Sequence, residues 1–298
     1  STLTNSQTFA TSGLLNSTSN DSKSDMNGYT ISNDITYNRK LSQSGRSISA
    51  SVTTTVSNNS SDSYLEALTN FYGLSASTDS VNQFTDYNKD GTTVSGTLMY
   101  SEPLVEKEQF LVFSYQGSLN KNESDKNNYD FSYLTNGYSS LDTNLSNVFD
   151  YTYFSHKVGT GWRYQTKELR MNFGIDYQSS NLKNNQTFPV ANDVEKTYQT
   201  FLPNAMVVWK VNKEQNMRLN YRTRTNLPSA EQLQDVLDNT DPTQLVLGNS
   251  GLKEEYRHSL HYAYDNMRSS SSSTFFIMVN ATFANNYVGK NSLYAMSD

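Results

Sequence analysis

The charged side chains best suited to bind a small ligand lie between residues 170 and 257. Arginine recurs at Arg218, Arg222 and Arg224, and in an extended chain residues two apart point to the same side. Guanidinium groups form paired hydrogen bonds with carboxylates and phosphates. The pattern predicts either a surface that attracts polar or anionic solutes, or charges neutralised by acidic neighbours. The candidates expected on this side are Arg170, Asp176, Lys210, Arg218, Arg222, Arg224 and Arg257.

A second candidate site is a calcium loop that begins at Asp86. Asp86, Asn88 and Asp90 place oxygen ligands at alternate positions, and Gly91 follows, as in the first half of a calcium-binding loop. Thr97 stands at the twelfth position, where such a loop carries a bidentate glutamate. Two interpretations stay open: an Asx-rich turn that enters a strand, or weak calcium binding in an outer loop.

Enzymatic chemistry finds little support in the sequence. The chain has 3 histidines and no cysteine. His258 and His261 are three apart, so on a strand they point to opposite faces and do not share one metal ion. The acidic residues do not converge with a histidine at a recognisable spacing. We therefore expect a protein that is not an enzyme and has no cofactor apart from the weak calcium candidate.

The charged residues belong to segments in which apolar and polar side chains alternate with a period of two. Between Leu169 and Tyr177 every second residue is apolar, and Arg170, Asn172 and Asp176 lie opposite. The stretches 204–211 and 217–224 repeat this alternation across a short turn, as in a β-hairpin with one apolar and one charged face. Two architectures fit: a soluble sandwich with the apolar face buried, or a membrane barrel with the apolar face in lipid.

Composition is compatible with the barrel. No apolar run approaches the ~20 residues of a spanning helix, whereas a spanning strand needs only ~9–11 residues. The 21 Tyr, 14 Phe and 2 Trp suit the aromatic girdles of such barrels. No basic patch with interleaved aromatic residues occurs, so we expect no nucleic-acid partner.

The connections between the predicted strands alternate in length. Tight turns are predicted at 42–45, 101–108, 165–167 and 212–215, and long polar loops at 58–93, 118–148, 180–198 and 225–253, the last with a helix start at Ser229. Residues 1–27 read as one weak strand plus an exposed loop. Short periplasmic turns and long outer loops are typical of an all-β, antiparallel, up-and-down transmembrane β-barrel. Tyrosines expected near the outer loops either stack on sugar rings or pack within their loops: Tyr64, Tyr72, Tyr87, Tyr129 and Tyr138.

One stretch, 201–264, also resembles the barrel region of Bacteroidetes-type TonB-dependent receptor-like outer-membrane proteins. The likeness lies in Phe201-Leu202-Pro203, the strand exit RTRTNLPSAEQL at 222–233, Asp241-Pro242 and GNSGLKEE at 248–255. Weaker likeness is found at Tyr100-Ser101-Glu102-Pro103-Leu104 and Gly161-Trp162-Arg163-Tyr164.

The resemblance implies a barrel of about 22 strands around a plug, of which residues 1–298 would form a segment of about half. We find no plug, no coupling box and no closing aromatic strand in this stretch. It further implies location in the bacterial outer membrane, contact with the lipid bilayer, a TonB-type energiser and a surface lipoprotein as partners, and nutrient uptake. The alternative is a surface-exposed β-rich binding or adhesion protein without transport activity.

Overall fold

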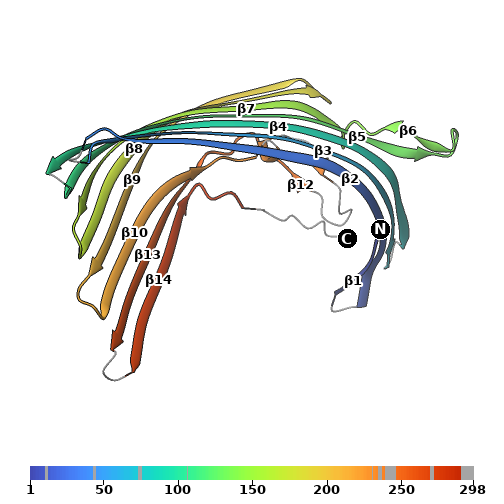
Figure 1. Cartoon of the computed structure of the whole chain (residues 1–298). Helices are drawn as coiled ribbons and strands as arrows, with labels where there is room; N and C mark the ends of the chain where they lie inside the picture. Colours follow the sequence, from blue (N-terminus) through green and yellow to red (C-terminus); the bar gives the residue numbers. More distant parts are fainter. Residues whose placement is uncertain are drawn as a thin grey trace.

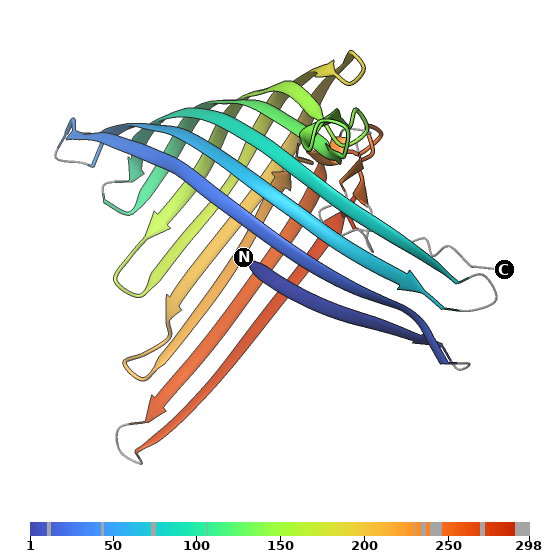
Figure 2. The ribbon, with the colours of Figure 1, turned by 90° about the vertical axis from the view of Figure 1, so that its right-hand side faces the viewer.

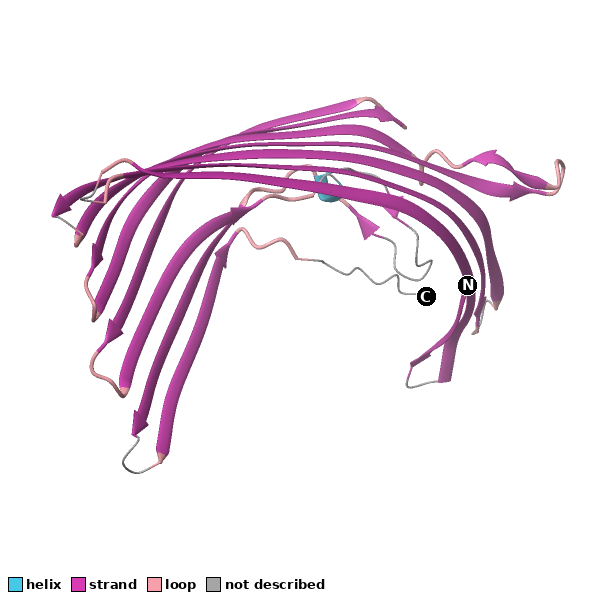
Figure 3. Ribbon diagram, viewed as in Figure 1, coloured by secondary structure: helices cyan, strands magenta, loops and turns pink. Residues whose placement is uncertain are grey.

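The computed structural model describes residues 1–10, 13–42, 45–72, 76–105, 107–229, 231–233, 237–238, 246–268 and 272–289. This part of the chain is almost entirely β-strand (Figure 3). The strands are β1 (Thr2–Ala10), β2 (Gly13–Lys40), β3 (Ser47–Phe71), β4 (Ser77–Val105), β5 (Gln109–Ser132), β6 (Gly137–Leu141), β7 (Asn147–Gln165), β8 (Leu169–Phe188), β9 (Asn192–Lys210), β10 (Gln215–Asn226), β11 (Leu237–Asp238), β12 (Val246–Leu247), β13 (Glu255–Arg268) and β14 (Ser273–Asn285). One short 3-10 helix, η1, covers Glu231–Leu233.

Twelve strands form one sheet in the order β1-β2-β3-β4-β5-β7-β8-β9-β10-β13-β14, with β6 paired to β5. Every pairing is antiparallel, and β11 pairs only with β12. The sheet curves into an open trough with β1 and β14 at its two edges (Figures 1 and 2). The expected all-β antiparallel architecture is confirmed, whereas the described residues do not close a barrel because β1 and β14 are not paired.

The long polar loops expected at 58–93, 118–148 and 180–198 are wrong, because most of these residues continue the strands. Strands β2, β4 and β5 contain 28, 29 and 24 residues. Residues 1–27 likewise form β1 and the first half of β2. Hydroxyl pairs stabilise the polar sheet across strands, for example between Ser24 and Ser63 at 2.9 Å. Of the four long connections expected, the one between β10 and β13 is confirmed, since residues 227–254 separate these strands.

The convex face carries an apolar belt over the part of each strand nearest the short turns. Its side chains are exposed, and no second layer formed by the described residues covers them. A soluble sandwich would bury this face, so the apolar belt requires an apolar surrounding medium. The exposed members include Ile31, Ile35, Val52, Val94, Leu98, Phe113, Leu119, Val158, Phe173, Ile175, Trp209, Ile277 and Val279.

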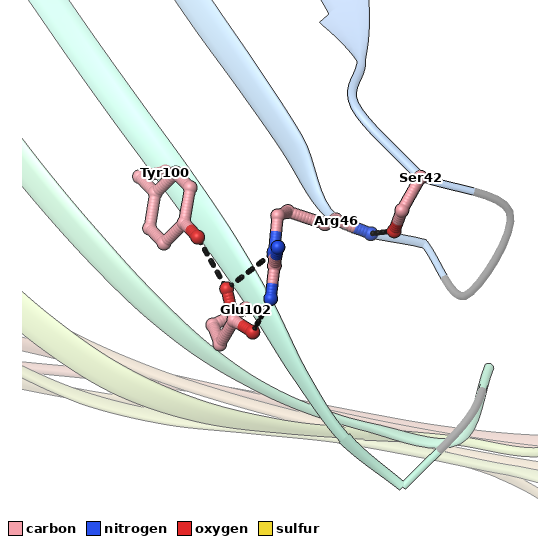
Figure 4. A network of polar contacts seen from close by, with 4 residues as sticks. All are labelled: Ser42, Arg46, Tyr100 and Glu102. Atoms are coloured by element: carbon pink, nitrogen blue, oxygen red, sulfur yellow. Dashed lines mark hydrogen bonds and ion pairs between the residues drawn. The ribbon is translucent and has the colours of Figure 1, made fainter.

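A polar network closes the short-turn end of this face (Figure 4). Arg46 donates through Nε to Glu102 Oε2 at 2.8 Å and also pairs with Oε1, and the Tyr100 hydroxyl donates to the same carboxylate. The Arg46 backbone N–H donates to Ser42 Oγ at 3.3 Å. A tyrosine with its ring beside the apolar belt and its hydroxyl on a charged pair suits a membrane–water boundary.

No helix in the described ranges is long and apolar enough to cross a membrane.

Candidate solute-binding site on the concave face

The concave face is identified by the segment that lies against it. The connection between β10 and β13 folds under the sheet (Figures 1 and 3), and its Leu233 packs in one cluster with Leu182 of β8. Leu182 therefore points into the trough. Strand alternation places Arg170 and Asp176 on the same side as Leu182, because the residues differ by even numbers without a bulge.

Register extends this face to the neighbouring strands. Asn204 of β9 lies opposite Gly174 of β8 and Arg222 of β10, and Arg222 lies opposite Ser259 of β13. By alternation the candidates on these strands share the concave face, namely Lys210, Arg218, Arg222, Arg224 and Arg257. The structure thus places all seven candidate charged residues on one face of the sheet.

Two adjoining hollows occupy the middle of this face. The larger, of about 530 Å³, suits a small solute. The smaller, of about 250 Å³, lies beside it against β13 and β14. Asn220, Arg222 and Arg224 line both. Further polar residues of the larger hollow are Lys157, Asn172, Asp176, Gln178, Asn204, Thr223 and Thr225.

Glycine makes room for the single carboxylate of the larger hollow. A Cβ on Gly159 of β7 would lie 1.9 Å from Asp176 Oδ1 and 2.5 Å from Ser114 Oγ. A Cβ on Gly174 would lie 3.0 Å from Asn204 Oδ1. The bare backbone at these positions lets Asp176 and Asn204 lie flat against the wall.

The charge of the hollows is positive. Lys157 and Arg222 are close enough to Asp176 to act on it electrostatically. No ion pair of Arg222 or Arg224 with a carboxylate occurs within the described ranges. Three cationic groups therefore face one carboxylate, and a polar or anionic solute group would find free guanidinium donors there.

The remaining candidates are arranged differently. Arg257 pairs with the buried Glu255, at 2.6 Å, so its charge is neutralised. Arg170, Lys210 and Arg218 share the concave face but line neither hollow.

The calcium-loop candidate is not a loop. Asp86, Asn88 and Asp90 lie within β4 and alternate on its convex face, where Asn58 donates to Asn88 and Asp90 at 3.2 and 2.9 Å. The Asn58 amide thus takes the place that a cation would have between Asn88 and Asp90, and the described residues hold no metal-binding group of three or more His, Asp or Glu. Asp241-Pro242 and residues 290–298 lie outside the described residues.

The described parts of the segment between β10 and β13 lie against the concave face beside the larger hollow. We call residues 227–229, 231–233, 237–238 and 246–254 the strap. Leu233 and Leu182 are fully buried, and Phe149 and Tyr151 complete the core, with Leu227 and Leu252 packed against it. Ser229 lies just before η1, where the sequence predicts a helix start, and forms a capping box: Gln232 N–H donates to Ser229 Oγ at 3.2 Å, and Ser229 N–H donates to Gln232 Oε1 at 2.9 Å.

Polar contacts hold the other end of the strap. Lys196 of β9 donates through Nζ to the carbonyls of Ser250 and Leu252 at 2.6 and 2.8 Å. Glu254 is buried, and its Oε2 accepts from the Thr200 hydroxyl at 3.3 Å. Burial raises the pKa of the Glu254 carboxyl, and hydrogen bonds from Thr225 and Thr200 oppose this in part. The strap is thus docked by an apolar core at one end and by lysine and glutamate at the other.

Sequence reasoning missed the amides of the hollow and the strap core. Asn204 and Gln178 carry no charge to single them out, and only register brings them beside Arg222. The run Leu227-Pro228-Ser229 gave the one available signal, a helix start after a strand exit.

The solved structures to which the chain is similar include receptors and a transporter. The chain is similar to the alcaligin outer-membrane receptor FauA from Bordetella pertussis at 11% identity, covering 91% of this chain and 41% of that one, with a TM-score of 0.43. For the ferric citrate transporter FecA in its unliganded form the identity is 9%, the match covers 86% of this chain and 39% of that one, and the TM-score is 0.45. For the ferric yersiniabactin uptake receptor FyuA from Yersinia pestis the identity is 10%, the match covers 90% of this chain and 46% of that one, and the TM-score is 0.44.

The chain therefore spans less than half the length of these three proteins. No protein with a curated description matches it. Residues 39–294, most of the chain, match the outer membrane protein beta-barrel family. The apolar belt accordingly faces the lipid of the bacterial outer membrane, and the chain belongs to the outer membrane protein beta-barrel family.

Proposed function

We propose that this chain forms part of the wall of a transport barrel that takes up polar nutrients through the outer membrane. The observation that carries the proposal is the difference in polarity between the two faces of one sheet. Phe173 and Ile175 face lipid, while Asp176 and Arg222 face a trough with two hollows. A wall that is apolar outside and charged inside is suited to enclose an aqueous path.

The free edges of the sheet support a larger barrel. At the level of the lipid an unpaired backbone N–H or C=O costs several kcal/mol, roughly, because no water is present to bond it. The belt residues Ile277 and Val279 lie in the edge strand β14. On the other side the free edge at the level of the lipid is β2, whose belt residues Ile31 and Ile35 lie beyond its pairing with β1. We propose that further strands pair with β14 and with this part of β2, so that residues 1–298 form a segment of a barrel of about 22 strands.

The remaining parts of the proposal rest on the sequence resemblance of residues 201–264. By that resemblance the barrel belongs to a Bacteroidetes-type TonB-dependent receptor, is driven by a TonB-type energiser and works with a surface lipoprotein. We propose that it is not an enzyme and needs no resident cofactor.

Cysteine labelling tests the wall. The chain has no cysteine, so single substitutions report one position each. Asn172→Cys and Asn204→Cys in outer-membrane vesicles should react with a charged, water-soluble maleimide, whereas the neighbours Phe173→Cys and Ala205→Cys should react only with an apolar one. Equal reaction of both pairs with the charged reagent would show that the convex face meets water and would refute a lipid-facing wall.

Uptake tests the transport step. Cells that produce the protein and cells that lack it are compared for entry of labelled dipeptides, oligosaccharides and iron chelates. One solute should enter at a rate that depends on the protein, and Arg222→Gln should lower that rate while Arg257→Gln, which removes a paired arginine, should lower it less. Uptake without any dependence on the protein refutes the proposal.

The parts of β2 to β5 that lie beyond the apolar belt, on the side away from the short turns, are called the strand extensions. They favour a second candidate function, a surface-exposed binding or adhesion protein without transport activity. Strands β2 to β5 contain 24 to 29 residues, far more than the ~9–11 that span a bilayer. If adhesion is the function, cells without the protein lose attachment to a surface and keep all solute uptake.

A further inference from the structure

An aromatic cluster lies on the convex face of the strand extensions, away from both hollows. Tyr64 of β3, Phe84 of β4 and Tyr129 of β5 are direct cross-strand neighbours in one row. The ring centroids of Tyr64 and Phe84 are 4.9 Å apart, and those of Phe84 and Tyr129 are 6.4 Å apart. We call this row, together with Phe131 and Tyr138, the aromatic platform.

The hairpin of β5 and β6 completes the platform. Tyr138 of β6 lies 5.6 Å from Tyr64, 5.9 Å from Phe84 and 5.3 Å from Phe131, measured between ring centroids. Its hydroxyl donates to Asn82 Oδ1 at 2.8 Å. The hairpin projects away from the trough (Figure 1). Tyr64 remains 40% exposed, so the rings are accessible to a ligand as well as packed on one another.

Free hydrogen-bond acceptors flank the row on both sides. Asp62 and Asp86 lie two residues from Tyr64 and Phe84 on the same face, roughly 7 Å along each strand. Glu66 flanks the row on its other side. None of these carboxylates forms an ion pair in the part of the chain that the structure describes.

This combination of groups points to a neutral saccharide. The apolar face of a sugar ring packs on an aromatic ring, and its hydroxyls donate to carboxylates, which only accept. A phosphorylated or sulfated ligand would be repelled by Asp62, Asp86 and Glu66. Lys23 of β2 lies opposite Tyr64 in the same row, but the three carboxylates outnumber it, so the balance of charge favours an uncharged, polyhydroxylated ligand over an anionic one.

The position of the platform identifies the source of the sugar. In β3 the apolar belt ends at Val56, eight residues before Tyr64; Leu68, beyond Tyr64 on the same face, is also exposed but stands between Glu66 and Asn70 and does not continue the belt. That separation is about 26 Å along the strand and, at a tilt of about 40°, about 20 Å above the hydrocarbon. The headgroup layer is only about 5–8 Å thick on each side, so the platform lies beyond the phosphates. It is continuous with the lipid-facing surface and faces sideways into the sugar layer.

We propose that the aromatic platform binds the neutral sugars of the glycolipid in the outer leaflet that surrounds the protein. Such binding would hold the strand extensions against the surrounding glycan. This proposal is independent of what the trough transports.

Calorimetric titration tests it, with the full-length protein in detergent and the polysaccharide released from the host's own outer-leaflet glycolipid by mild acid. The wild type should bind. Asp62→Asn with Asp86→Asn should weaken binding about tenfold, since two charge-assisted acceptors are replaced by neutral ones. Asp150→Asn, a carboxylate on β7 outside the platform, is the matched control and should leave the affinity unchanged.

A second pair of variants separates binding from folding. Phe84→Tyr keeps a ring at the centre of the platform and should bind as the wild type does, whereas Phe84→Leu keeps an apolar side chain without a ring and should bind about fivefold more weakly. Heat-modifiable gel mobility checks that each variant is folded. Absence of binding by the wild type overturns the proposal, as does binding of a lysine-rich peptide or of maltohexaose in preference to the host polysaccharide.

Discussion

Removal of one leucine from the strap core should release the strap from the wall. Leu233 and Leu182 are each 0% exposed and pack together with Phe149 and Tyr151. Leucine-to-alanine changes in such cores cost about 2–4 kcal/mol, because apolar contacts are lost and a cavity remains. Since the strap docks on a sheet held by its own pairings, the cost acts on docking. Leu233→Ala should therefore raise the undocked fraction about 30- to 1,000-fold.

A thiol at Ser180 reports that fraction. Ser180 is 2% exposed and lies two residues before Leu182 on the same face of β8. Ser180→Cys in the otherwise cysteine-free chain should react with N-ethylmaleimide at a rate proportional to undocking, and Leu233→Ala should accelerate it at least about 30-fold. Leu247→Ala, at a strap residue that is 62% exposed, is the control. An acceleration below about threefold would mean that the leucine core does not hold the strap.

Three further outcomes follow from contacts described above. Because the pKa of the Glu254 carboxyl is raised on docking, the stability that its protonated form gives to the docked strap is fully present below the ordinary glutamate pKa and is lost as pH rises through the folded-state pKa. Hydrogen exchange of the strap amides, corrected for intrinsic rates, should therefore show more protection at acid pH. Glu254→Gln should remove this pH dependence. Ser229→Ala removes the acceptor of the Gln232 N–H and should cost about 1 kcal/mol, a rise of about fivefold in Ser180→Cys labelling; an unchanged rate would show that the capping box does not contribute to docking. Arg46→Ala breaks a pair whose side chains are 46% and 29% exposed, so the thermal midpoint of the barrel should stay within about 2 °C of the wild type, and a larger fall would show that the pair is stronger than exposed ion pairs generally are.

The part of the fold that was predictable is the part that separates two media. Between Leu169 and Tyr177 lipid lies on one side and the trough on the other, so alternate residues must differ in polarity. The same contrast marks Met217 to Arg224. In these segments the sequence predicts the strand and also which side of the sheet each side chain faces.

In the strand extensions the buried concave face carries polar side chains such as Thr69, Gln83 and Asn128, and the convex face lies outside the lipid, so the strict alternation of apolar and polar residues is absent there. The sequence of residues 1–27 and 58–93 therefore looks like loops, although cross-strand pairs such as Thr18 with Thr69, 3.1 Å apart, support a regular ladder. Threonine and serine content was the available signal, and it is weak because both residues are also common in turns.

For the site, the alternation of side chains along each strand predicts that Arg222 and Asp176 lie on one face. The hollow, however, depends on which residues of neighbouring strands lie opposite each other. A shift of two residues would keep every face correct and would remove Asn204 from Arg222. Turn geometry and strand length set that register. Strand length could not be predicted, because the outer parts of the strands look like loops in the sequence.

The order of pairing has a consequence for assembly. From β1 to β5 and from β7 to β10, each strand pairs with the next one along the chain, so each added strand closes only a single tight turn. Little chain entropy is lost per step, and the wall can grow strand by strand in either direction. The step from β10 to β13 is different, since it must close the span of residues 227–254. This step is the expected kinetic bottleneck of assembly, where shortening the intervening chain would speed maturation most.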